Sequence, residues 1–319
     1  MTPDHSDPLA PLSQQVIEAF DKVNGGIHAG FRPAHAKGLL LSGEFTPAPE
    51  GAALTTAPHL HRPSTPVSVR FSDFAGVPAV ADNGDNSSPR GIAIRFHLAE
   101  HVHTDIIGHS TNSFPTRTAE EFLGFLGAVY ATAQSTEKPS PIEMFLGSHP
   151  AALAFVMTPK PIPVSFAQEQ FFGVSAYKFH NASESRYGRY QIIPATGASY
   201  LTAEEAAGRS ADFLFDELRE RLAKEPVKMV IAVQMAEEGD VTDDATAVWP
   251  DERPVVELGT ITLTGVVENN EAEQRHIIFD PIPRVEGIEA SADPLLEPRA
   301  SIYLMSGRRR RKAGAAQTA

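Results

Sequence analysis

The sequence contains no cysteine, which excludes disulfide bonds, catalysis by a thiolate and ligation of an iron or another metal by a thiolate. It also lacks any apolar run that approaches the ~18 residues of a membrane span. Residues 1–7 do not lead from a basic region into an apolar one, as a secretory signal does. We therefore expect a cytoplasmic protein with no membrane partner.

Positive charge is scarce, because 27 Lys and Arg residues stand against 40 Asp and Glu residues and the formal net charge is −13. This balance argues against nucleic-acid binding, since contacts to phosphates need a basic surface. One strongly basic run, RRRRK at 308–312, is an exception to this acidic composition. Such a run is typical of a solvated tail, or of a patch that contacts nucleic acid or a membrane.

Hydrophobic periodicity predicts both helices and strands. Apolar residues recur at helical spacing in four segments, and alternate with polar or small residues in five others. The strands bracket the helices rather than alternating with them, which favours a mainly antiparallel α+β fold. No linker or internal repeat interrupts the chain, so we expect one domain over 1–319, with a basic tail after 306. The predicted helices are 12–23, 118–133, 151–154 and 203–222, and the predicted strands are 67–71, 92–96, 176–180, 228–234 and 255–263.

Two patterns, far apart in the sequence, contain residues suited to iron binding and to acid–base catalysis. Arg299 lies one helical turn before Tyr303, so their side chains share a helix face. A neighbouring positive charge favours the phenolate form of a tyrosine, which is an anionic ligand suited to ferric haem. Far upstream, the segment AHAKG at 34–38 offers one imidazole, His35, for acid–base work.

Several further strings follow in a fixed order. They are PVSVRFSDFAG at 66–76, PRGIAIRF at 89–96, DIIG at 105–108, FDP at 279–281 and GIE at 287–289. Each resembles a segment of haem catalases, and the resemblance extends from about Arg32 to Arg310. The chain resembles a small member of that superfamily, of the kind called catalase-related peroxidases.

The resemblance implies an architecture and a cofactor. The expected fold is α+β, an antiparallel eight-stranded barrel with helices packed outside it and haem b buried against it. We expect the chain to lack the N-terminal arm and the C-terminal helical domain of ordinary catalases. Because that arm interlocks catalase tetramers, we also expect a smaller homo-oligomer.

On the distal side of the haem the resemblance assigns four residues. His35 matches the histidine that takes a proton from peroxide and returns it to the departing oxygen, forming a ferryl intermediate. Ser72 matches the serine that bonds this imidazole and fixes its orientation. Phe122 matches a phenylalanine stacked on the haem, and Phe114 matches a second distal aromatic residue.

On the proximal side the resemblance makes Tyr303 the iron ligand and Arg299 its charge partner. Arg32, Arg70 and Arg310 match arginines that contact the haem propionates, where a guanidinium pairs with a carboxylate through two hydrogen bonds. Arg310 would be the member of the basic run with this role.

The sequence departs from the family at His109. Ordinary catalases have an asparagine at this position, directly after Asp-x-x-Gly, and it binds peroxide beside the distal histidine. An imidazole also donates a hydrogen bond, but it is bulkier and titrates. We expect weakened oxygen release from peroxide, unless Asn112 compensates from three residues away.

These residues favour a haem peroxidase that reduces hydrogen peroxide or organic hydroperoxides with a small organic electron donor. A catalase that dismutates peroxide, and a hydroperoxide isomerase or dehydratase, are alternatives on the same scaffold. A non-enzymatic haem carrier or sensor would need the tyrosine and arginine but not His35 with Ser72. A non-haem metal site is a further alternative, because His59-x-His61 and His101-x-His103 have the spacing of ligands.

Overall fold

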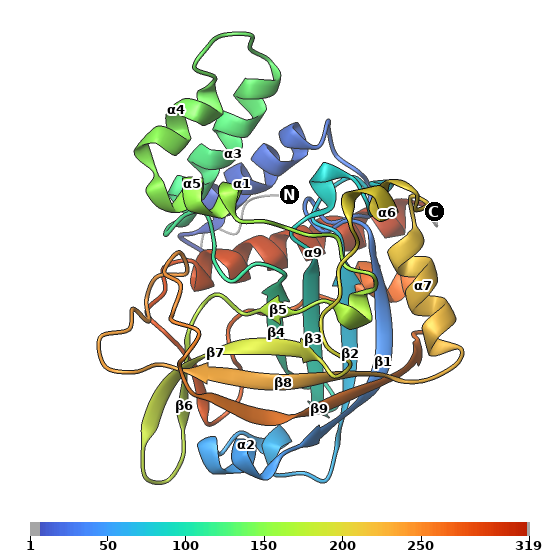
Figure 1. Cartoon of the computed structure of the whole chain (residues 1–319), viewed down its shortest axis with the longest axis vertical. Coiled ribbons are helices and arrows are strands. Elements are labelled where there is room, and N and C mark those ends of the chain that lie inside the picture. The colour runs from blue at the N-terminus through green and yellow to red at the C-terminus, as the bar shows by residue number, and fades with distance from the viewer. Residues whose placement is uncertain (1–6, 318–319) are drawn as a thin grey trace.

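The computed structural model describes residues 7–317 (Figure 1), so the segment in which no secretory signal is expected lies largely outside the described residues. Eight antiparallel strands form a closed barrel, paired in the order β1-β2-β3-β4-β5-β7-β8-β9, with β9 returning to β1. Two short strands, β6 and β10, extend the sheet beyond β7. The barrel strands are β1 (Gly38–Pro47), β2 (Thr65–Ser72), β3 (Gly91–Ala99), β4 (Val102–His109), β5 (Phe171–Phe172), β7 (Ser185–Pro194), β8 (Val227–Met235) and β9 (Val255–Val266), with β6 at Tyr177–His180 and β10 at Ile288–Ala290.

This closed, eight-stranded antiparallel barrel confirms the predicted fold class. Its interior is filled by alternate residues of the strands. On β2, Val67, Val69 and Phe71 are buried on one face, as a period of two requires. Phe71 stacks on Phe166 with ring centroids 5.4 Å apart. Each such side chain stabilises the fold by about 1.5–3 kcal/mol through its removal from water.

Helices cover one end and the outer surface of the barrel. The long helix α9 lies beside α1, where Ser13 Oγ donates to Ser301 Oγ at 2.9 Å and Arg309 pairs with Asp21. Helices α3, α4 and α5 project from the barrel next to α1 (Figure 1). The helices are α1 (Ala10–Val23), α2 (Pro49–Leu54), α3 (Ala119–Ala133), α4 (Pro141–Ser148), α5 (Pro150–Met157), α6 (Ala203–Ala207), α7 (Phe213–Leu222), α8 (Asn270–His276) and α9 (Leu296–Gln317), with 3-10 turns at Pro58–Leu60, Asp85–Ser87 and Phe166–Gln168.

The predicted start of α3 is found in the structure. Thr118 accepts a hydrogen bond from the Glu121 backbone N–H, and the Glu121 carboxylate returns to the Thr118 backbone, which completes a capping box. None of the helices within 7–317 is long and apolar enough to cross a membrane.

The single helix predicted over 203–222 is wrong, because the structure divides it into α6 and α7. Gly208 ends α6. The Asn83 side-chain amide then bonds the backbone carbonyls of Ala206 and Arg209, while the Asp82 carboxylate accepts from the Leu214 N–H at 2.7 Å. These long-range bonds satisfy the backbone groups at the break, so no continuous helix is needed there.

The basic run is not a solvated tail. It lies within α9, where its members have different environments. Arg308 is exposed, Arg309 pairs with Asp21, and Arg311 donates to the His276 carbonyl. Arg310 is buried, with 3% of its surface exposed. The helical register therefore selects one arginine of the run for the interior.

Candidate active site

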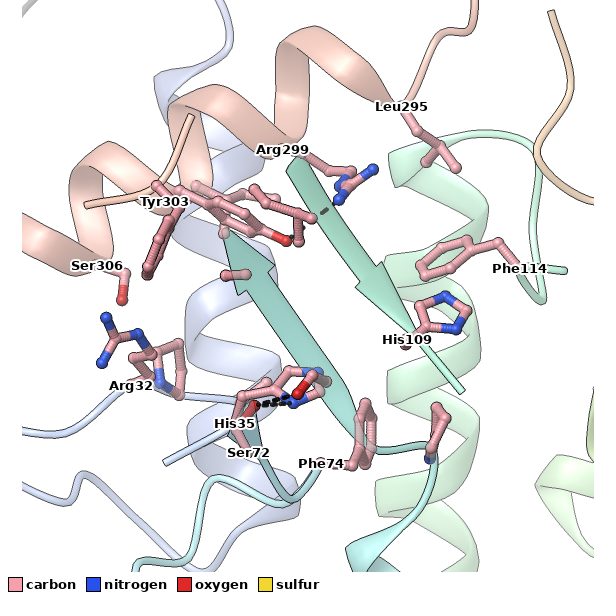
Figure 2. A pocket seen from close by; sticks show the side chains of 18 of the residues that line it. Arg32, His35, Ser72, Phe74, His109, Phe114, Leu295, Arg299, Tyr303 and Ser306 are labelled. Carbon is pink, nitrogen blue, oxygen red and sulfur yellow. Dashed lines mark hydrogen bonds between the residues drawn. The ribbon is translucent and has the colours of Figure 1, made fainter. Parts of the chain in front are cut away.

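One cavity lies between α9 and the ends of β2, β3 and β4, and its empty space, open mouth included, is about 1580 Å³. Two walls face each other across it. Arg299 and Tyr303 project from α9, while His35, Ser72, Phe74 and His109 lie on the opposite side (Figure 2). All ten side chains singled out from the sequence line this cavity: Arg32, His35, Arg70, Ser72, His109, Phe114, Phe122, Arg299, Tyr303 and Arg310.

His35 is held in a constrained position at the start of the barrel. Its φ is 57°, in the left-handed region that non-glycine residues seldom adopt, and its N–H bonds the Phe74 carbonyl at 2.6 Å. The ring Nδ1 lies 3.1 Å from Ser72 Oγ, and the ring meets the edge of Phe74. A Cβ on Gly91 would lie 2.7 Å from Nδ1, so only glycine fits behind this imidazole.

The His35 imidazole is neutral at pH 7. Burial, followed by the positive charge of Arg70, lowers the pKa of His35 to about 3. A neutral imidazole keeps a lone pair on one nitrogen. His35 can therefore accept a proton inside the cavity.

His109 ends β4 on the same wall, beside Phe114. Its Nδ1 lies 2.8 Å from Thr111 Oγ1 and 3.3 Å from the Thr111 backbone N. Burial, followed by the charge of Arg299, lowers the pKa of His109 to about 3. The expectation that this imidazole titrates is therefore wrong for the range near neutral pH. Asn112 is not among the described residues that line the cavity, so nothing places it where it could compensate.

On the opposite wall, an Arg299 guanidinium nitrogen lies 3.5 Å from the Tyr303 hydroxyl, the long limit of a hydrogen bond. Burial lowers the pKa of Arg299, but the Tyr303 and Tyr177 phenols more than offset this and leave it raised. The guanidinium thus stays charged beside the phenol oxygen.

Three further guanidiniums gather at one side of the cavity without a matching anion. Arg70 and Arg310 are buried, Arg32 is partly buried, and all three bond neutral acceptors, among them the Ile277 carbonyl and the Gln274 side chain. None of the three forms an ion pair with a carboxylate of residues 7–317. Burial, and then the charge of Arg310, lowers the pKa of Arg70 to about 9. A buried cluster of like charges calls for an anionic ligand.

Three of the strings quoted from the sequence, which contain Arg95, Asp105 and Asp280, are joined near the cavity by one ion pair and one hydrogen bond. Arg95 on β3 donates from Nε and Nη2 to the two carboxylate oxygens of Asp105 on β4, at 2.9 and 2.7 Å. Asp105 also accepts from the Asp280 backbone N–H at 2.8 Å. This contact ties the segment after α8, which includes the cavity residue Phe279, to the barrel.

Three residues that contact the two imidazoles of the site were not singled out from the sequence. Phe74, Gly91 and Thr111 each lie within two residues of a predicted site residue or of a quoted string. Their side chains carry no acid–base or ligand chemistry, so residue type gave no signal. Position alone could have drawn attention to them.

The comparisons with known proteins agree with this geometry. A family model described as catalase matches residues 27–317. The chain belongs to the catalase family. It is 33% identical over 296 residues to a catalase-related peroxidase of Mycolicibacterium paratuberculosis, covering 92% of each chain. It is 32% identical to a catalase-related peroxidase of Synechococcus elongatus, covering 92% of this chain and 86% of that one.

Longer members of the family share the same fold. A solved fungal catalase superposes with a TM-score of 0.78 at 26% identity, covering 89% of this chain and 60% of that one. A catalase of Alkalihalophilus pseudofirmus is 30% identical, and the match covers 85% of this chain and 43% of that one. The resemblance to catalase-related peroxidases predicted from the sequence is thus confirmed, and this catalase-family enzyme is an oxidoreductase that acts on peroxide.

Membership of this family implies a haem iron, and the cavity fits one. Haem carries two carboxylates, which supply the anions that the cluster of Arg32, Arg70 and Arg310 lacks. The phenol of Tyr303 offers an oxygen ligand from the facing helix. The non-haem alternative finds no support among the described residues, which contain no group of three or more His, Asp and Glu side chains placed to hold a metal.

Proposed function

We propose that this catalase-family enzyme is a haem b peroxidase that reduces hydrogen peroxide or organic hydroperoxides with a small organic electron donor. The reaction takes ROOH, two electrons and two protons to ROH and water, and the donor gives up the two electrons and two protons. The observation that carries the proposal is the pair of facing walls, with neutral His35 on one and Tyr303 beside Arg299 on the other.

Each residue has a role in this proposal. Tyr303 would hold the iron through its phenolic oxygen, and the Arg299 guanidinium beside it would stabilise negative charge on that oxygen. Arg32, Arg70 and Arg310 bind the propionates, while Phe114 and Phe122 form the apolar distal lining. When bound, the haem would supply the two electrons that cleavage of the O–O bond requires and would recover them from the organic donor.

Proton transfer falls to the distal wall. The His35 imidazole would accept the proton of the peroxide and give it to the departing oxygen, which leaves as water or an alcohol. Ser72 holds the ring of His35 through Nδ1. The neutral state of His35 at pH 7 makes it ready to accept.

The peroxidase assignment is supported by two relatives named catalase-related peroxidase, which match this chain over most of their length. Dismutation of peroxide is the alternative, and His109 stands where catalases have an asparagine. The test is to purify the protein with haem and to compare oxygen release from hydrogen peroxide with oxidation of a small phenol. Vigorous oxygen release with little phenol oxidation would establish a catalase instead.

The cofactor assignment has its own test. Tyr303→Phe removes the ligand oxygen and keeps the ring, so the ferric spectrum typical of tyrosinate ligation should disappear and haem retention should weaken. Tyr177→Phe is the control, because that hydroxyl is buried and bonds the Pro281 carbonyl at 2.9 Å. If the Tyr303→Phe spectrum matched that of the parent, another residue would be the ligand.

A further inference from the structure

We propose that Thr111 fixes His109 as a hydrogen-bond donor to peroxide, so that the cavity holds two imidazoles with opposite tasks, His109 donating and His35 accepting. This deepens the proposed function and rests on it for the identity of the substrate. Thr111 is a positioning residue in this proposal, since it acts through His109.

The hydrogen bonds to Nδ1 determine the tautomer of His109. The Thr111 backbone N–H points at Nδ1 with N and Nδ1 3.3 Å apart, and a backbone N–H can only donate. Nδ1 must therefore present its lone pair, which the Thr111 hydroxyl at 2.8 Å can share. In a neutral imidazole the proton is then on Nε2.

The Nε2–H of His109 lacks an acceptor. Nε2 is buried without a hydrogen-bond partner in the part of the chain that the structure describes, although His109 lines the cavity. Buried polar groups in native proteins are nearly always bonded, and a donor without a partner here points to a ligand. The group to be bound is an acceptor, such as a peroxide oxygen.

His35 is held in the complementary way. Its Nδ1 faces Ser72 Oγ at 3.1 Å, and the Gly91 carbonyl lies 3.5 Å from the same oxygen. If the Ser72 hydroxyl proton points to that carbonyl, Oγ accepts from Nδ1–H, and Nε2 of His35 keeps its lone pair. This tautomer is the one a base requires.

Both imidazoles remain neutral over the working pH range. The pKa of each is lowered to about 3, by burial first, and then by Arg70 for His35 and by Arg299 for His109. A hydroperoxide has one proton to give and oxygen lone pairs to receive. It therefore suits an acceptor at His35 for the proton and a donor at His109 for an oxygen lone pair.

The first experiment observes the tautomer directly and needs no turnover. The full chain, labelled with ¹⁵N in histidine and loaded with diamagnetic zinc protoporphyrin, is studied by long-range ¹H–¹⁵N spectroscopy. The signals of His109 are those lost in His109→Asn. The Nε2–H form is expected in the parent, in Thr111→Ser and in Thr111→Val, because all three keep the backbone N–H that donates to Nδ1. A parent in the Nδ1–H form would overturn the proposal.

The second experiment uses the haem-loaded enzyme and follows peroxide by stopped flow. His109→Leu should lower the second-order rate with peroxide about tenfold, the worth of one hydrogen bond of about 1.4 kcal/mol, while saturating turnover changes less. His109→Asn should keep most of the rate, because the amide also donates. Thr111→Val should lie between parent and His109→Leu, and Thr111→Ser should restore the parent rate.

The two experiments separate this proposal from the proposed function. If the protein retained no haem, the proposed function would fail, but the tautomer could still be read in the unloaded chain. If haem bound and peroxide reacted while His109→Leu matched the parent rate, the donor role would be wrong and the peroxidase would stand. A rate loss in Thr111→Ser as large as that in Thr111→Val would show that packing, not the hydroxyl, is what matters at Thr111.

Discussion

At the scale of single residues, burial decides what each ionisable group of the cavity can do. His35 and His109 are identical in type, and burial makes both neutral. Their neighbours then separate them, since a serine hydroxyl faces Nδ1 of the first and a backbone N–H faces Nδ1 of the second. The chemistry of each imidazole therefore depends on the hydrogen-bond partner of its Nδ1, which cannot be known from the residue types alone.

His35→Ala should keep haem bound but slow the reaction with peroxide by a factor on the order of 10²–10⁴, the usual worth of a positioned acid–base group. Stopped-flow mixing with hydrogen peroxide measures this. Ser72→Ala serves as a graded control with a smaller loss, because it removes the orienting contact and leaves the base. Rates within a few-fold of the parent in His35→Ala would mean that the base lies elsewhere.

A buried histidine outside the cavity gives a pH-dependent prediction. His59 is enclosed by Phe45 and Phe96, and burial, followed by the charges of Arg62 and His61, lowers the pKa of His59 to about 4. Between about pH 6.5 and 4 the unfolded chain binds a proton here that the folded chain does not. This group therefore removes stability as the pH falls through that window.

His59→Leu should abolish that loss. Its unfolding free energy, compared with the parent, should improve by about 2–3 kcal/mol on going from pH 7 to pH 4.5. Urea unfolding at the two pH values measures the difference. The exposed His276→Leu is the control and should show little change. A difference between parent and His59→Leu that did not depend on pH would show that His59 is not buried as a neutral group.

At the scale of elements, the strands position the site through close backbone packing. The first residue of β3, Gly91, lies against both His35 and Ser72, which come from a loop and from the end of β2. The strand pairing Ser72 with Gly91 brings these groups together. The catalytic arrangement thus follows from the register of β2 and β3 as much as from the side chains themselves.

Gly91→Ala should disturb this arrangement without removing any functional group. The new Cβ would lie 2.7 Å from His35 Nδ1 and 2.8 Å from Ser72 Oγ, so the imidazole must move. We expect the peroxide reaction to slow by about 10- to 100-fold, as misplacement of a catalytic group does. Gly127→Ala on α3 is the control, because its new Cβ has nothing within 4 Å. This variant should be about 1 kcal/mol more stable than the parent and should react with peroxide at the parent rate. Equal rates in both variants would contradict the argument.

The sequence predicted elements well where local signals decide them and poorly where distant contacts do. Alternation located β2 and β3, and Thr118, a typical N-cap residue followed by two acidic residues, located the start of α3. The break between α6 and α7 depends on Asp82 and Asn83, more than a hundred residues away, and Gly208 is the one local signal that marks it. Likewise, the resemblance named the cavity residues, but the contacts of Thr111 with His109 are seen only in the folded structure.

At the scale of the whole molecule, the cavity gathers parts from distant regions of the chain. Arg32 comes from the loop before β1, Arg70 from β2 and Arg310 from α9. Each positive charge lowers the pKa values of the others. Burial is the largest cause of the lowered pKa of Arg32, and the charges of Arg70 and Arg310 follow. A bound anion would offset this repulsion, so we expect anion binding to stabilise the folded molecule.

Haem should therefore stabilise the protein more than its dimethyl ester, which lacks charged carboxylates. We expect the ester to give about 2–3 kcal/mol less stabilisation, the equivalent of roughly hundredfold weaker binding. Thermal unfolding with equal excess of each porphyrin measures this. In Arg310→Met, the difference in stabilisation between haem and its dimethyl ester should be smaller, and the unloaded chain should be more stable. The exposed Arg308→Met should show neither change. Equal stabilisation by both porphyrins would show that the arginines do not bind the propionates.

The contact of α1 with α9 has a consequence for the timing of synthesis. Ser13 and Ser301 are bonded across 288 positions. At ~5–20 residues per second a ribosome needs about 15–60 s to pass from one to the other. For nearly all of that interval the nascent chain has His35 but neither Tyr303 nor the helix that closes the cavity. Stable uptake of the cofactor must therefore wait until α9 has emerged, however early the barrel strands begin to pair.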